Sequence, residues 1–134
     1  MAVVLVVNDD ADMLDVYEAV LIELGHQPVP RLEMVPDPDS VLQVGADAVV
    51  IDLQAEAHPM AGLRVIEALR RHPATQTLPI VLSTGAVQEA KRLADQLERL
   101  GVPVLLKPFA IDQLRDVLGR VLPAGQGAEE TVES

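Results

Sequence analysis

Residues 2–10, AVVLVVNDD, decide the fold. The first six are all apolar, and β-branched valine predominates, which is typical of a strand buried on both faces of a parallel sheet. The run then ends abruptly in Asn8, Asp9 and Asp10. Because polar residues follow such a strand where it leaves the core, this break predicts that its carboxyl end lies at the functional edge of the sheet.

Similar strand-like stretches alternate with helix-like stretches along the chain. Three more apolar runs have the length of buried strands. They are residues 46–52 (ADAVVID), 78–84 (LPIVLST) and 102–108 (VPVLLKP). A stretch at 27–32 contains Pro28 and Pro30, so we expect an edge strand there. Apolar residues at spacings of three and four predict five helices. These are expected at 11–24, with the stripe Met13, Val16, Val20 and Leu24, and at 40–44, 62–72, 87–100 and 111–122.

This alternation of five strands with five helices predicts an α/β fold. The short connections require right-handed crossovers, so the expected architecture is a flavodoxin-like, doubly wound sheet of five parallel strands in the order 2-1-3-4-5. One domain is expected over residues 1–122. Residues 123–134, PAGQGAEETVES, are small, polar and acidic, and we expect a disordered tail.

The composition excludes several classes of protein. Hydrophobic residues make up 49% of the 134 residues, but the chain has one Tyr, one Phe and no Trp, so its core is expected to be aliphatic. The net charge of −11 disfavours direct binding to nucleic acid. The absence of Cys excludes disulfides and thiolate metal sites, and no apolar run reaches the length of a transmembrane helix. We therefore expect a cytoplasmic protein without membrane contact.

In doubly wound sheets, the functional site lies outside the carboxyl ends of the strands. The polar residues expected at that edge are Asn8, Asp9, Asp10, Asp52, Ser83, Thr84 and Lys107. Neighbouring carboxylates suit a hard cation such as Mg²⁺, and a lysine with a hydroxyl suits the oxygens of a phosphoryl group. A carboxylate can also act as the nucleophile and form an aspartyl phosphate. The residues alone therefore indicate phosphoryl chemistry on an aspartate.

From about Val3 to Leu122, the chain resembles the receiver domains of bacterial response regulators in two-component signalling. The resemblance rests on the acidic cluster after the first strand, on Asp52 at the end of the third, on PIVLST with Thr84, and on KPF at 107–109. In receivers, a histidine kinase or phosphotransfer protein passes a phosphoryl group to the strand-three aspartate. The resemblance implies a stand-alone phosphoprotein that signals through a downstream partner. It implies no enzyme, beyond self-catalysed phosphorylation and dephosphorylation.

The resemblance also implies a metal site. Asp52 would be both the phosphoacceptor and a Mg²⁺ ligand, together with Asp9 and the backbone carbonyl of Gln54. Asn8 falls at the first of the two usual acidic positions. As a neutral amide it would bind the metal weakly or through water, so we expect lowered magnesium affinity. Without the family pattern, Asp9 and Asp10 would simply be first-turn acids that the helix dipole favours.

The chain also matches the receiver pattern at residues that contact the phosphoryl group, and it departs from the pattern at the residue that changes conformation on phosphorylation. Thr84 and Lys107 would contact the phosphoryl group, and Pro108 is expected to follow a cis peptide bond that aims the lysine into the site. Thr84 is also a candidate cap for the helix that follows. Receivers often rotate an aromatic ring on phosphorylation, and Val104 stands at that position. The loop after Asp52 is two residues longer than usual.

Partners are expected on one face. The fourth helix, the fifth strand and the closing helix form the surface that receivers commonly use for partners or for a homodimer. An alternative function is a pseudo-receiver, which binds proteins independently of phosphorylation, and Asn8, Ala61 and Val104 favour it. A small phosphatase or dehalogenase ranks last, because this length leaves no room for a cap domain. Neither a P-loop nor a dinucleotide fingerprint follows the first strand.

Overall fold

The computed structural model describes residues 2–32, 38–52, 61–107 and 109–122. Its elements are β1 (Val3–Val7), α1 (Ala11–Glu23), β2 (Gln27–Arg31), α2 (Pro38–Val44), β3 (Ala48–Asp52), α3 (Ala61–Arg71), β4 (Ile80–Thr84), α4 (Val87–Arg92), α5 (Ala94–Arg99), β5 (Val104–Leu106) and α6 (Ile111–Val121). The strands form one parallel sheet in the order β2-β1-β3-β4-β5. The predicted fold class and strand order are therefore confirmed.

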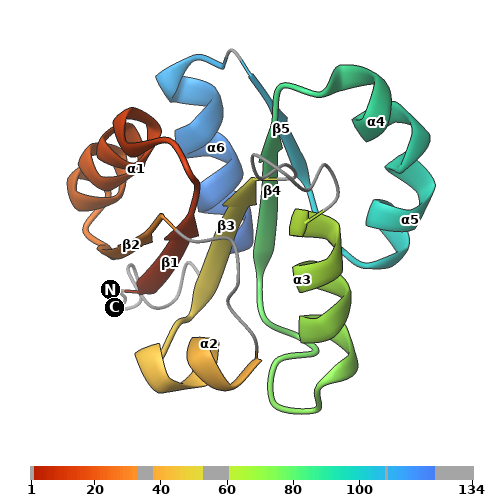
Figure 1. The fold of residues 1–134 in the computed structure, drawn as a ribbon. Coiled ribbons are helices and arrows are strands. Elements are labelled where there is room, and N and C mark those ends of the chain that lie inside the picture. The colour runs from red at the N-terminus through yellow and green to blue at the C-terminus, as the bar shows by residue number, and fades with distance from the viewer. Residues whose placement is uncertain (1, 33–37, 53–60, 108, 123–134) are drawn as a thin grey trace, which may run out of the picture.

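The helices cover both faces of this sheet. Helices α1 and α6 lie on one face, and α2 to α5 lie on the other (Figure 1). The apolar run of β1 supplies both cores, because successive side chains of a strand point to opposite faces. Val4 and Val6 belong to the cluster on the α1 and α6 face, whereas Leu5 and Val7 belong to the cluster on the other face. This double burial explains why the run contains no polar residue before Asn8.

Strand β2 lies at an open edge of the sheet, as its prolines predict. The N–H of Gln27 donates to the carbonyl of Ala2, and the carbonyl of Arg31 accepts from the N–H of Asn8, so both groups point toward β1. Because backbone groups alternate in direction along a strand, Pro28 and Pro30 face the open edge. Neither has an N–H to offer there, so the edge lacks two of the donors that another strand would need.

The stretch at 87–100 forms two helices instead of the one that its apolar stripe predicts, so the described residues contain six helices and not five. Leu93, between α4 and α5, has φ −94° and ψ 2°, outside the helical region. Its N–H still donates to the carbonyl of Glu89, and its carbonyl still accepts from Leu97. The helix is therefore interrupted at one residue. Neither glycine nor proline lies at this point, so the sequence carries no signal for the break.

Two side chains hold the amino end of β1. The N–H of Ala2 donates to Nδ1 of His26 at 3.0 Å, and the N–H of Val3 donates to Oδ2 of Asp47 at 2.8 Å. Both N–H groups lie at the start of the sheet, where side chains satisfy donors that the neighbouring strands do not. Across the described ranges, no helix is both long enough and apolar enough to cross a membrane.

Candidate functional site

A row of three buried polar side chains crosses the carboxyl end of the sheet. Asp52 of β3 is paired with Ser83 of β4, and Asn8 directly follows the paired residues Val7 and Ile51. Alternation places Asn8, Asp52 and Ser83 on the face covered by α1 and α6, because Val6, Val50 and Val81, two residues before each of them, lie in that core. Their exposed fractions are 1%, 8% and 1%. The core on this face therefore ends in polar groups at the ends of three neighbouring strands.

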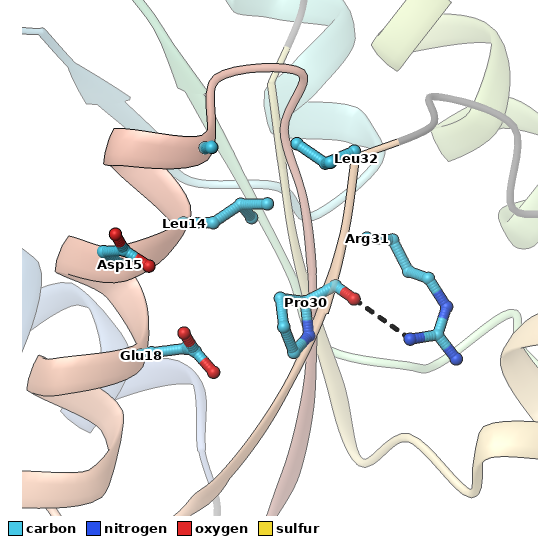
Figure 2. A pocket seen from close by; sticks show the side chains of 7 residues that line it. Leu14, Asp15, Glu18, Pro30, Arg31 and Leu32 are labelled. Atoms are coloured by element: carbon cyan, nitrogen blue, oxygen red, sulfur yellow. Dashed lines mark hydrogen bonds between the residues drawn. The ribbon is translucent and has the colours of Figure 1, made fainter.

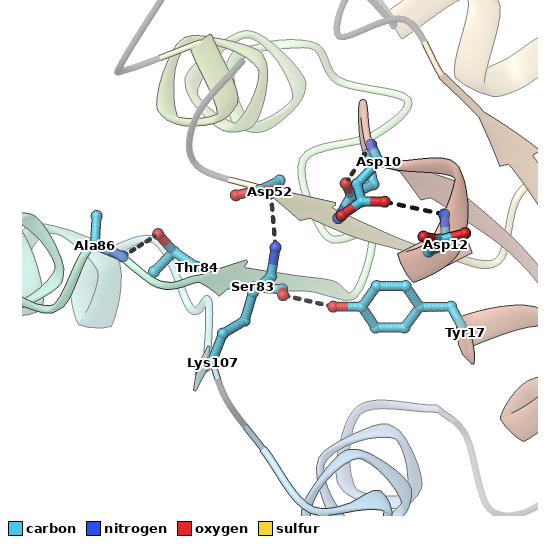
Figure 3. Close-up of polar contacts among 9 residues, drawn as sticks. Asp10, Asp12, Tyr17, Asp52, Ser83, Thr84, Ala86 and Lys107 are labelled. Atoms are coloured by element: carbon cyan, nitrogen blue, oxygen red, sulfur yellow. Dashed lines mark hydrogen bonds and ion pairs between the residues drawn. The ribbon is translucent and has the colours of Figure 1, made fainter. Parts of the chain in front are cut away.

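An ion pair stands at the centre of this site. The Nζ atom of Lys107 lies 3.0 Å from Oδ2 of Asp52, and Figure 3 shows the two side chains meeting above the end of β4. The backbone N–H of Lys107 donates to the carbonyl of Thr84, which fixes the lysine against the neighbouring strand. The side chains of Asp52 and Lys107 are largely shielded from water, since 11% of the first and 24% of the second is exposed. Such shielding strengthens the electrostatic interaction between them.

Thr84 ends β4 and is fully buried. Its Oγ1 accepts a hydrogen bond of 2.9 Å from the N–H of Ala86, immediately before α4 (Figure 3). The prediction that Thr84 caps this helix is therefore wrong, because Ala86 is the N-cap of α4 and has no side-chain capping bond. Thr84 instead holds the turn that precedes the helix. Because the oxygen acts as the acceptor there, this bond does not use the hydroxyl proton.

The acidic cluster after β1 is partly engaged in local structure. Asp10 is the N-cap of α1, and its side chain accepts from the N–H of Asp12 at 2.9 Å (Figure 3). The N–H of Asp10 in turn donates to Oδ1 of Asn8 at 2.9 Å. Asp9 is exposed. The Nδ2 atom of Asn8 is buried and has no hydrogen-bond partner among the residues that the structure describes.

These residues fit a magnesium ion only in part. Asp9 and Asp52 are the carboxylates that the sequence assigns to the metal. Within the described ranges, no three Asp, Glu, His or Cys side chains come close enough together to hold a metal ion. At the position where the receiver pattern has an acid, Asn8 directs its oxygen to the backbone and leaves an N–H group in the site. An N–H group repels a cation, so the pattern of donors predicts weak magnesium binding.

Tyr17 was not among the sequence-predicted site residues, although its hydroxyl reaches the polar row. Its Oη donates to Oγ of Ser83 at 2.5 Å, and the side chain is fully buried (Figure 3). Burial raises the pKa of Tyr17 to about 12; the Asp52 carboxylate adds to the rise, and the hydrogen bond with Ser83 opposes it. The ring also packs against Phe109, with centroids 6.0 Å apart.

The position of Tyr17 differs from the stripe that the sequence predicts for α1. The helix buries Leu14, Tyr17, Val20 and Leu21, whereas Met13 and Leu24 are only partly buried against the same core. The available signal was chemical: Tyr17 and Ser83 are polar residues on otherwise apolar elements. A buried Tyr hydroxyl usually has a hydrogen-bond partner, and Ser83 provides one.

Two grooves flank α1, and they differ in their relation to the site. One is lined by Met13, Val16, Lys107, Phe109 and Ile111, so it adjoins the ion pair. The other lies between α1 and the end of β2, with Asp15 and Glu18 on its α1 side and Pro30 and Leu32 on its β2 side (Figure 2). None of the residues that line this second groove belongs to the polar row. We therefore treat only the first groove as adjacent to the candidate site.

The structure thus brings together some of the predicted site residues and leaves others apart. Asp52 and Lys107 are in contact, and Thr84 lies at the end of the neighbouring strand. Val104 is half-buried in the core on the α2 to α5 face. Gln54 and Pro108 lie outside the described residues, as do the tail at 123–134 and most of the loop after Asp52.

No family model and no curated protein matches the chain. The chemotaxis protein CheY4 of Vibrio cholerae superposes with a TM-score of 0.76 at 23% identity, over 91% of this chain and 99% of that one. A sensor protein from Polaromonas sp. JS666 gives 0.71 at 26% identity, over 90% and 94%.

A third solved structure is the receiver domain of a sensor histidine kinase from Pseudomonas aeruginosa PAO1, which has a magnesium ion coordinated in its active site cleft. It superposes with a TM-score of 0.69 at 24% identity, over 90% of this chain and 96% of that one. The chain therefore has the fold of response-regulator receiver domains, and the fold that the resemblance implies is confirmed.

Proposed function

We propose that this protein is a receiver that accepts a phosphoryl group on Asp52 from a histidine kinase or phosphotransfer protein. The observation that carries the proposal is the contact between Asp52 and Lys107 at the carboxyl end of the sheet. A carboxylate that ends a buried strand and contacts a lysine is suited to nucleophilic attack on phosphorus, because the cation can then stabilise the phosphoryl oxygens.

The chemistry follows from these groups. A carboxylate oxygen of Asp52 attacks the phosphorus of a phosphohistidine. A P–O bond forms as the P–N bond breaks. The bonding electron pair returns to the imidazole nitrogen, and the ring, which keeps the proton on its other nitrogen, leaves as neutral imidazole. The ammonium of Lys107 donates to a phosphoryl oxygen, and the Thr84 hydroxyl donates to a second one. Burial of Thr84 and partial burial of Lys107 exclude bulk water and make these contacts stronger.

Magnesium belongs to the same proposal. Asp9, Asp52 and the backbone carbonyl of Gln54 would hold the ion, which neutralises negative charge on the transferring group when it is bound. The partial fit described above makes this binding weak. The protein's own groups therefore carry more of the charge stabilisation than in a site with a complete set of acids.

Signalling would follow from a change in surface structure. Thr84 is hydrogen-bonded to the turn that begins α4, so a hydroxyl drawn to the phosphoryl group would alter that turn. Val104 provides no ring to rotate. The surface formed by α4, α5, β5 and α6 is the proposed site for a downstream partner or a second copy of the chain.

The test is the intact mass of the protein after incubation with magnesium and acetyl phosphate. Wild type should gain one phosphoryl group that is stable in acid and labile in base. Asp52→Ala should gain none, and Lys91→Met, which removes the other lysine of the chain, should behave like wild type. A gain on the Asp52→Ala protein would place the chemistry on another residue and refute the assignment.

A pseudo-receiver is the second candidate, and the unusual Asn8 favours it. It predicts no mass gain under any magnesium concentration and no response to beryllium fluoride. It also predicts that partner binding, measured by pull-down against Asp52→Ala, is the same for both proteins. A phosphoryl gain on Asp52 would rule out this alternative.

A further inference from the structure

The side-chain amide of Asn8 is the least explained polar group in the described part of the molecule. Its exposed fraction is 1%, and Nδ2 lacks a hydrogen-bond partner among the described residues. Native structures rarely leave a buried N–H group unpaired, and such groups gather at functional sites. The amide therefore calls for a ligand that accepts a hydrogen bond.

The orientation of this amide is determined by the backbone. The N–H of Asp10 donates to Oδ1 of Asn8 at 2.9 Å. If the amide were turned over, its NH₂ group would face that N–H, and two donors would meet. The carbonyl oxygen is therefore committed to the start of α1, and the NH₂ group is the part that remains for the site.

The location of the amide identifies the chemical class of the ligand. Asn8 follows β1 beside Asp52, on the same face of the sheet. Lys107 is in contact with Asp52 from β5's end, and the hydroxyl proton of Thr84, at the end of β4, is not used by its bond in the turn before α4. Donors from three strand ends thus lie at the same edge of the sheet as this carboxylate, and one of them, Lys107, contacts it. Hydrogen-bond donors at this position suit the oxygens of an anion. A cation would be repelled by the ammonium group of Lys107 and by the NH₂ group of Asn8.

We propose that Asn8 is a direct hydrogen-bond donor to an oxyanion bound at Asp52. The inference rests on the proposed function, in which that oxyanion is the phosphoryl group on Asp52. Asn8 then replaces part of the charge stabilisation that an acid and a metal ion supply together. The consequence is a receiver whose phosphorylated state depends only weakly on divalent cations.

The chain allows a direct measurement, because Asn8 is its sole asparagine. Protein labelled with ¹⁵N-asparagine gives one side-chain NH₂ pair in the NMR spectrum, and beryllium fluoride serves as the probe for a bound phosphoryl group. Without magnesium, its addition should shift one of the two amide protons downfield and slow its exchange with water. An unchanged pair in the presence of a probe that still shifts the Asn8 backbone N–H would overturn the inference.

Two variants separate the donor from the metal. Asn8→Asp keeps the acceptor for the Asp10 N–H and removes the donor, and Asn8→Leu removes both groups. In EDTA, both should be phosphorylated by acetyl phosphate about tenfold or more slowly than wild type, the usual effect of one hydrogen bond to a charged oxygen. Asn8→Asp should then recover steeply as magnesium is added, while wild type should change little. Thermal unfolding checks that each variant is folded.

The outcomes also separate this inference from the proposed function. If wild type gains a phosphoryl group only with magnesium, and Asn8→Asp is faster than wild type at every concentration, Asn8 is only a weak metal ligand and the inference fails while the function stands. If Asn8→Leu matches wild type in EDTA, the N–H group has no part in the reaction. If no folded protein gains a phosphoryl group at any magnesium concentration, the proposed function and the inference fail together.

Discussion

The two ends of the sheet differ in whether their polar groups have hydrogen-bond partners. At the amino end, the N–H groups of Ala2 and Val3 each have a side-chain acceptor, His26 and Asp47. At the carboxyl end, polar side chains are buried in a row, and the Nδ2 atom of Asn8 has no partner among the described residues. A buried polar group without a partner costs about 1–3 kcal/mol. The amino end is therefore arranged for stability, while the carboxyl end retains groups whose partners must come from a ligand.

The largest expected effect is at the carboxyl end, where Lys107→Met removes the ammonium group that contacts the buried Asp52 carboxylate. Removal of one member of a buried ion pair costs about 3–5 kcal/mol, and partial exposure of Lys107 reduces this to an expected loss of about 2 kcal/mol. Urea denaturation at pH 7 would measure it. The double variant Lys107→Met, Asp52→Asn should recover most of the stability, and Lys91→Met should lose little. If Lys107→Met were as stable as wild type, the contact between Lys107 and Asp52 would contribute nothing to the free energy of unfolding.

The carboxyl end also contains a pair of hydroxyl groups, those of Tyr17 and Ser83, that are hydrogen-bonded to each other. Tyr17→Phe keeps the ring against Phe109 and removes the hydrogen bond to Ser83. One such bond contributes about 1 kcal/mol, so the free energy of unfolding should fall by about that amount. Ser83→Ala should cost a similar amount, and the double variant should cost less than the sum of the two. Strict additivity would show that the two hydroxyls do not interact in solution.

At the amino end, Asp47→Ala removes the acceptor for the Val3 N–H. The loss should again be about 1 kcal/mol in urea denaturation. Asp47→Asn retains an oxygen at this position and should keep most of the stability. Neither variant should change phosphorylation of Asp52, because the substitution lies at the opposite end of the sheet. A change in that reaction would mean that the two ends are energetically coupled.

The smallest expected effect is a dependence of stability on pH, which arises from His26 at the amino end of the sheet. Burial, and next the positive amino terminus, lower the pKa of His26 below its ordinary value of 6.5. The unfolded chain then binds the proton more readily than the folded one. The contribution of His26 to stability is therefore fully present above pH 6.5 and is lost as the pH falls through the folded-state pKa. The urea midpoint should fall between pH 7 and pH 5, and His26→Gln should reduce that slope.

The sequence predicts the sheet well because β1 is buried on both faces. Continuous burial requires an uninterrupted apolar run, and the prolines of β2 restrict that strand to the edge, so order and edge follow from composition. The ends of strands also predict where Asp52, Thr84 and Lys107 lie. Both predictions use only the local order of apolar and polar residues, together with the rule that the carboxyl ends of parallel strands meet at one edge of the sheet.

Features that depend on tertiary packing were not predicted. The stripe on α1 points to Met13 and Val16, but the helix is rotated so that Tyr17 meets Ser83, 66 residues away. The break at Leu93 has no glycine or proline to mark it. His26 looks like an ordinary residue after a helix, and its role as an acceptor for Ala2 is visible only when β1 and β2 are paired. The sequence does single out Asn8, yet only the bond from Asp10 shows which end of its amide remains for the site.

Tyr17 also gives this protein a built-in optical reporter. The chain has no tryptophan, so one side chain produces its tyrosine fluorescence and dominates its near-ultraviolet absorption. That side chain is shielded from solvent and hydrogen-bonded to the residue beside Asp52. Emission from the native protein therefore reports on the environment of the polar row without a label or an engineered fluorophore.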